Sequence, residues 1–206
     1  MAALVLPLVL TGLACGGSGD RALVTSADPR LAEIALRILP DLASRSGMEL
    51  RDPVRVERRS RVDLERYLEF KIDEEFPEGR AELLSEAYAL LGLVPHDMDL
   101  RGTLKALYLE QIAGFYDPDS TTLFVLDDQP EEAIESLLVH ELVHAIQDQN
   151  TDLDAITAPG LNNDRRVAAQ AAIEGHATLV MFEFMMREQG RGALDPMDVP
   201  DFSARL

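Results

Sequence analysis

Two histidines four residues apart form the segment with the most evident chemistry, His140-Glu141-Leu142-Val143-His144. On an α-helix, residues at this spacing lie on one face, so both imidazoles can bind a single metal ion. Glu141 directly follows the first histidine and can reach the same site, where its carboxylate would accept a proton from an attacking water. The spacing predicts metal-assisted hydrolysis; the alternative is two ordinary histidines on an amphipathic helix.

The elements around the two histidines indicate the helix that carries them. Apolar residues recur at helical spacing through residues 131–149, at Ile134, Leu137, Leu138, Leu142 and Ile146. Asp127-Asp128-Gln129-Pro130 precedes them, and proline and acidic residues suit the first turn of a helix. We therefore expect a helix over about 131–149.

A catalytic zinc ion usually has three protein ligands and one open position, so two imidazoles need a third residue. A second helix is predicted from a cap at 162–164 to about residue 189, and it offers Glu174 and His176. A helix turns by about 100° per residue, so these two side chains point roughly 200° apart and cannot both face one ion.

The neighbours on this second helix favour Glu174. Its face is shared with Val167, Ala171, Thr178 and Met181, whereas that of His176 is shared with Ala169, Val180, Glu183 and Arg187. We take the first face as inward and the second as turning toward solvent. A buried carboxylate needs a partner, and a zinc ion would supply one. The alternatives are His176 as the ligand, or Glu174 as an ordinary acid on an alanine-rich helix.

The segment before the first helix has strand character. In residues 114–126, aromatic and β-branched residues flank Asp117-Pro118-Asp119-Ser120, a combination typical of a β-hairpin. Upstream, the patterns predict a strand at 54–56 and helices that begin at Asp28-Pro29 (interrupted at Pro40), at Ser60, near residue 80 and at Asp97 or Asp99. The fold class expected is α+β and predominantly helical.

Four segments follow from this pattern. They are a signal and tether at 1–20, a helical N-terminal scaffold at 21–113, a metal-site region at 114–190, and a linker or truncated C-terminal segment at 191–206. The formal net charge of −18 argues against nucleic acid as a partner, because phosphate binding needs clustered Lys and Arg.

The N-terminus points to export. Residues 2–14 are apolar but too short to span a bilayer, and Cys15 follows the small residue Ala14 and precedes a Gly/Ser tether. The segment resembles a bacterial lipoprotein signal, which implies a lipid anchor at Cys15 in the cell envelope; the alternative is a buried apolar helix with a stray cysteine. As the only cysteine, Cys15 excludes an intrachain disulfide.

Residues 114–178 resemble a gluzincin, the branch of zincin metallopeptidases that combines H-E-x-x-H with a downstream glutamate. The chain is similar to envelope metallopeptidases with a His-Glu-x-x-His-Ala-x-Gln-Asp-Gln segment, here 140–149, and a Glu-Gly-x-Ala-Thr segment, here 174–178. The resemblance implies a zincin-like fold with a small hairpin or sheet beside the first helix. In such enzymes the edge strand lies along the cleft and pairs with an extended substrate; an ordinary core hairpin is the equal alternative.

The resemblance also implies roles for single residues. His140, His144 and Glu174 would bind one Zn²⁺ ion, and Glu141 would be the general base. The metzincin pattern is excluded, because it would need Gly and His where this chain has Gln147 and Asn150.

Three further residues are candidates for supporting roles. Thr178 stands where the thermolysin-like pattern places an Asp that orients a histidine, and Asp148 is the alternative for that role. Tyr116 is the candidate for contacting the oxyanion or substrate. The function expected is a zinc-dependent peptidase acting on peptides or proteins; the alternatives are an inactive zinc-binding lipoprotein and a helical lipoprotein without metal.

Overall fold

The computed structural model describes residues 23–158, 162–188 and 190. The helices are α1 (Pro29–Ser46), α2 (Arg61–Glu75), α3 (Arg80–Leu90), α4 (Leu100–Gln111), α5 (Glu131–Asn150), α6 (Leu153–Thr157) and α7 (Asn163–Glu188). The strands are β1 (Val24–Thr25), β2 (Val54–Arg59), β3 (Gly114–Asp117) and β4 (Thr122–Leu126). The predicted α+β class with a helical majority is confirmed.

The predicted export signal with Cys15 and the predicted linker at 191–206 lie outside the described residues. Within the described part of the chain, no helix combines the length and apolar character that crossing a bilayer requires.

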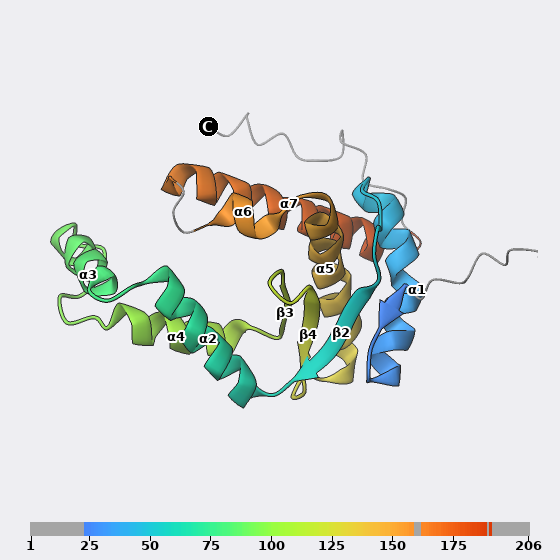
Figure 1. Ribbon diagram of the computed structural model, residues 1–206, viewed down its shortest axis with the longest axis horizontal. Coiled ribbons are helices and arrows are strands. Elements are labelled where there is room, and N and C mark those ends of the chain that lie inside the picture. Colours follow the sequence, from blue (N-terminus) through green and yellow to red (C-terminus); the bar gives the residue numbers. More distant parts are fainter. Residues whose placement is uncertain (1–22, 159–161, 189, 191–206) are drawn as a thin grey trace, which may run out of the picture.

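The sheet is mixed and joins both halves of the chain. Its order is β1-β2-β4-β3, with β1, β2 and β4 parallel and β3 antiparallel to β4. The predicted hairpin is therefore confirmed, and β3 lies at an edge of the sheet. Because β2 pairs with β4, residues of the N-terminal segment share a sheet with residues of the metal-site region (Figure 1).

Helices α1, α5 and α7 pack against one another beside the sheet (Figure 1). Val56 on β2 and Leu123 on β4 contribute to their shared core, and both are fully buried. Helix α5 is enclosed on most of its circumference, which explains why its hydrophobic pattern is broader than one stripe. Helix α2 forms a second, smaller core in which Leu64 and Leu68 pack with Leu126 of β4.

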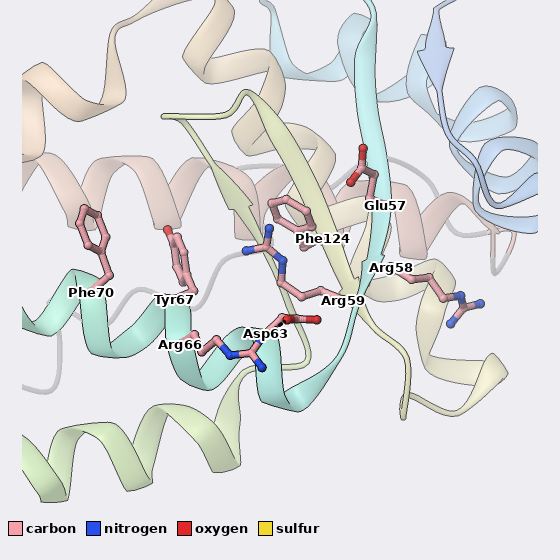
Figure 2. A pocket seen from close by; sticks show the side chains of 8 residues that line it. All are labelled: Glu57, Arg58, Arg59, Asp63, Arg66, Tyr67, Phe70 and Phe124. Atoms are coloured by element: carbon pink, nitrogen blue, oxygen red, sulfur yellow. Dashed lines mark hydrogen bonds and ion pairs between the residues drawn. The ribbon is translucent and has the colours of Figure 1, made fainter.

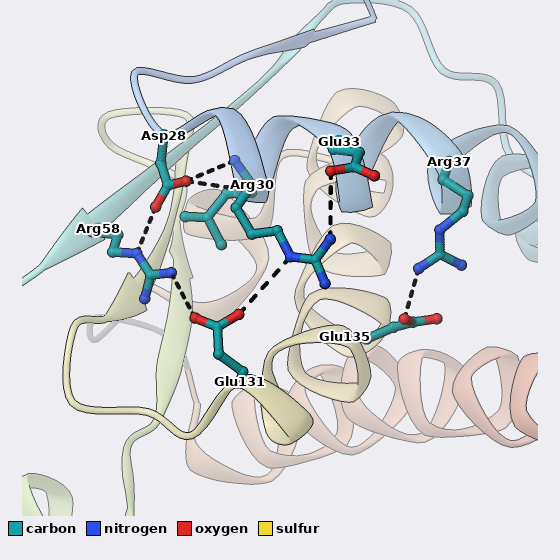
Figure 3. A network of polar contacts seen from close by, with 8 residues as sticks. Asp28, Arg30, Glu33, Arg37, Arg58, Glu131 and Glu135 are labelled. Atoms are coloured by element: carbon teal, nitrogen blue, oxygen red, sulfur yellow. Dashed lines mark hydrogen bonds and ion pairs between the residues drawn. The ribbon is translucent and has the colours of Figure 1, made fainter.

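A polar network ties the start of α1 to β2 and α5 (Figure 3). Asp28 caps α1, as predicted, by accepting from the backbone N–H groups of Arg30 at 2.8 Å and Leu31 at 3.3 Å. Its second oxygen accepts from Arg58 Nε at 2.6 Å, and Arg58 also lies 3.6 Å from Glu131. The guanidinium of Arg58 hydrogen-bonds Asp28 and lowers the pKa of that carboxyl.

One expectation about the helices is wrong. Pro40 does not interrupt α1, which continues to Ser46 and ends at Gly47 with a positive φ of 66°. A proline inside a helix costs about 3 kcal/mol, but the turn beyond it buries Leu42 completely against the core, which offsets that cost. Asp99 caps α4 as expected, and Leu109 of α4 packs partly buried against the smaller core.

Candidate metal centre

The three predicted metal ligands converge on one point from two helices. His140 and His144 lie one turn apart on α5, and their Nε2 atoms are 3.1 Å apart. Glu174 on α7 places Oε2 at 3.3 Å from His140 Nε2 and 3.5 Å from His144 Nε2. The two rings meet edge to face, with an interplanar angle of 84°.

These separations fit a tetrahedral zinc site. Ligand atoms at the usual 2.0–2.2 Å from a tetrahedral ion lie about 3.3–3.6 Å from one another. The observed atom pairs, at 3.1, 3.3 and 3.5 Å, approximate three edges of such a tetrahedron. Two imidazoles and one carboxylate are also the donor set of many catalytic zinc sites. The three residues can therefore hold a metal ion with little rearrangement.

The choice of Glu174 over His176 matches this geometry, but the reason given for it is wrong. The buried stripe of α7 contains Ala177, Val180 and Phe184, and the two candidates flank it on opposite sides. The side chain of Glu174 is 51% exposed, so its face borders solvent rather than core. His176 is half-buried, and its ring contacts α5 and the end of α1.

Glu141 lies beside the three ligand residues and is almost fully buried. Its Oε2 accepts a hydrogen bond of 3.0 Å from the backbone N–H of Tyr116 on β3. Burial raises the pKa of Glu141, and this outweighs the lowering by the nearby His144 and His140. The edge strand thus holds the carboxylate predicted to act as a base, and burial makes that carboxylate a stronger proton acceptor.

The charges of the three ligand residues are strongly linked. Hydrogen bonds from His140 and His144 hold the pKa of the Glu174 carboxyl well below its usual range. Burial by itself would lower the pKa of His144, but its contact with Glu174 and the charge of Glu141 raise it overall. The site therefore favours positive charge between the rings and the carboxylate, which a divalent cation also supplies.

The sequence prediction missed Gln147, which contacts Nδ1 of His144, the ring nitrogen that does not face the other two ligand residues. Gln147, on the next turn of α5, places Oε1 at 2.8 Å from His144 Nδ1. Asp148, the predicted candidate, instead accepts hydrogen bonds from the hydroxyl of Tyr116 at 2.8 Å and from the backbone N–H of Leu153 at 3.2 Å. Position 147 lies three residues after the second histidine, a helical spacing that places it on the ring's Nδ1 side.

The other two supporting candidates lie outside the ligand cluster. The hydroxyl of Tyr116 is bound to Asp148, and burial raises its pKa, so the phenol stays protonated. Thr178 is half-buried one turn after Glu174, and no hydrogen bond joins its side chain to either ligand histidine within the described part of the chain.

A cleft of about 460 Å³ opens beside the ligand residues, between α7 and α2. His144 and Glu174 line this cleft, together with apolar side chains such as Ile173 and Leu153. Arg166 of α7 and Glu75 of α2, which also line the cleft, form an ion pair of 2.8 Å. A ligand in this cleft would contact both apolar surface and charges of either sign.

A second hollow, of about 540 Å³, lies over the sheet face next to α2 (Figure 2). There the guanidinium of Arg59 stacks on Phe124, 3.5 Å from the ring centroid, with Tyr67 nearby. Its described lining includes no histidine, cysteine, serine or threonine, so it offers neither the imidazole and thiolate ligands of a zinc site nor a hydroxyl or thiol nucleophile beside a histidine base.

No protein-family model, curated protein or solved structure matches this chain.

Proposed function

We propose that this protein is a zinc-dependent peptidase of the gluzincin type. The observation that carries the proposal is the convergence of His140 Nε2, His144 Nε2 and Glu174 Oε2 at tetrahedral separations beside Glu141. An edge strand next to the H-E-x-x-H helix and a second helix with the glutamate support a zincin-like arrangement.

Four residues would have distinct roles in peptide hydrolysis. His140, His144 and Glu174 would hold the ion, which when bound polarises a scissile carbonyl and acidifies water. Glu141 would accept the proton of the attacking water and donate it to the leaving amine. Its hydrogen bond to the Tyr116 N–H fixes one oxygen and leaves the other to make this transfer.

The cleft beside the ligands supports a peptide as the substrate. Strand β3 forms one border of the site, and the antiparallel register turns the main-chain groups of Tyr116 away from β4. The N–H of Tyr116 donates to Glu141. The carbonyl oxygen of Tyr116 points in the same direction and would accept a hydrogen bond from the main chain of an extended peptide.

The test is Glu141→Gln in the purified protein. We expect stoichiometric zinc to be retained and hydrolysis of labelled casein to fall by on the order of 10²- to 10⁴-fold, because general base catalysis is lost. His140→Ala is the matched ligand variant and should lose the zinc as well. Undiminished hydrolysis by Glu141→Gln would refute the mechanism.

A second candidate is a zinc-binding protein without catalysis. The observation in its favour is the bond of the Tyr116 hydroxyl to Asp148, which removes the predicted oxyanion contact. Stoichiometric zinc in the wild-type protein without cleavage of casein or a mixed peptide library would support this candidate.

A further inference from the structure

We propose that Gln147 and His176 form a hydrogen-bonded relay that fixes which nitrogen of His144 carries its proton. This inference rests on the proposed metal site and assigns positioning roles to two residues that are not ligands. The relay runs from the end of α1 through α7 to α5, and its members are Ser46, His176, Gln147 and His144.

The first anchor of the relay is the backbone carbonyl of Ser46. It lies 3.2 Å from His176 Nε2. A carbonyl oxygen only accepts, so in neutral His176 the proton must be on Nε2, and Nδ1 is left as an acceptor. Gln147 Nε2 lies 2.9 Å from that Nδ1 and donates to it.

The second anchor is the backbone carbonyl of Ile173, which accepts from the same Gln147 Nε2 at 2.9 Å. Both amide hydrogens of Gln147 are therefore used, and the amide cannot flip without placing its oxygen against a carbonyl. The orientation leaves Oε1 facing His144 Nδ1 at 2.8 Å. That nitrogen must carry a hydrogen, so the lone pair of His144 is on Nε2, toward His140 and Glu174.

The relay works against a competing contact. Glu174 Oε2 lies 3.5 Å from His144 Nε2 and favours a proton on that nitrogen, where it would block a metal ion. The contact from Gln147 is shorter, and the residue is only 3% exposed, so water cannot replace its amide. Gln147 thereby prepares His144 as a ligand before any ion arrives, in the way that residues behind a metal-bound histidine commonly do.

The relay can be tested by measuring the tautomers of His144 and His176, which requires neither bound zinc nor an activity assay. In the metal-free protein at about pH 9, well above the usual imidazole pKa, two-bond ¹H–¹⁵N spectra report the tautomer of each histidine. We expect an Nδ1–H form for His144 and an Nε2–H form for His176. Gln147→Met should convert His144 to the Nε2–H form and weaken zinc binding by on the order of 10- to 100-fold.

Three further variants separate positioning from packing. Gln147→Glu keeps an oxygen against His144 and should retain the Nδ1–H form of that ring, while its second oxygen meets the Ile173 carbonyl and should lower stability. His176→Leu removes the first anchor but not the second, so its loss of affinity should be smaller than that of Gln147→Met. Gln149→Met makes the same change two residues along α5, where the amide contacts Arg51 and Asp52, and should leave zinc affinity unchanged.

The relay is overturned if His144 keeps the Nδ1–H form in Gln147→Met, or if His144 loses that form in Gln147→Glu. Should Gln147→Met not fold, the spectra of Gln147→Glu and His176→Leu still decide the question. A wild-type protein that binds no zinc would refute the proposed function, whereas the tautomers of the metal-free protein would still test the relay.

Discussion

Replacing Gly114 by Ala tests whether the edge strand β3 holds the candidate base in place. A Cβ at this position would lie 2.7 Å from the backbone oxygen of Phe124 and 2.8 Å from Leu137 Cδ2. The leucine methyl can move, but the backbone oxygen belongs to the central strand β4 and cannot, so β3 must shift. Such a shift would disturb the 3.0 Å hydrogen bond from the Tyr116 N–H to Glu141.

Two effects of opposite sign determine how much Gly114→Ala changes the free energy of unfolding. Overpacking costs typically about 1–3 kcal/mol, whereas removing a glycine stiffens the unfolded chain and contributes about 0.4–1 kcal/mol of stability. Overpacking is the larger of the two effects, so we expect urea denaturation to show a net loss of about 1–2 kcal/mol in the free energy of unfolding. Zinc binding should persist, because no ligand residue is on β3, while casein hydrolysis should fall by at least about tenfold as Glu141 loses its anchor.

Gly175→Ala is the matched control, because Gly175 lies between Glu174 and His176 yet has no atom within 4 Å of its added Cβ. This variant should gain about 0.5–1 kcal/mol of stability from helix propensity and keep zinc binding and hydrolysis. The reasoning is refuted if Gly114→Ala is as stable as the wild-type protein. If stability falls but hydrolysis does not, β3 does not position the base.

Two further variants test contacts away from the ligand atoms. Asp28→Ala removes both a helix cap and the partner of Arg58, so urea denaturation should show a loss of about 1–2 kcal/mol, against a smaller loss for Asp28→Asn, which can still cap α1. Since the pKa of Asp28 is lowered in the folded protein, this contribution is present above the usual Asp pKa and is lost as pH falls through the lower folded value; a wild-type advantage over Asp28→Asn that grows on acidification would contradict it. Tyr116→Phe removes the hydroxyl that donates to Asp148 and should cost about 1 kcal/mol of stability while changing kcat by less than about threefold, whereas a hundredfold loss of kcat would restore the oxyanion role to this residue.

The elements that position the site follow from local chemistry, and most of them were predicted from sequence. The helix of His140 and His144, the hairpin before it and the caps at Asp28, Ser60 and Asp99 are each specified by residues a few positions apart. Such signals act within one turn of the chain, so they need no tertiary contact to be read.

The roles of side chains on α7 depended on how that helix is rolled against its neighbours. Periodicity gives the angle between Glu174 and His176 around the helix axis, but it does not say which side meets α5 at the histidines. Both residues flank the buried stripe, so the sequence pattern assigned their faces wrongly, although it selected the residue that the structure places beside the two histidines.

Only the tertiary structure decided the contacts that join distant segments. The amide of Gln147 meets His176 from 29 residues away, and the ring of His176 meets Ser46 from 130 residues away. Pro40 likewise remains within α1 because the core beyond it is buried by α5 and α7. Sequence determined which residues could bind a metal ion, because that chemistry depends on residue type and local spacing. Packing determined which nitrogen, which oxygen and which neighbour each of them meets, because those contacts depend on helices that are far apart in the chain.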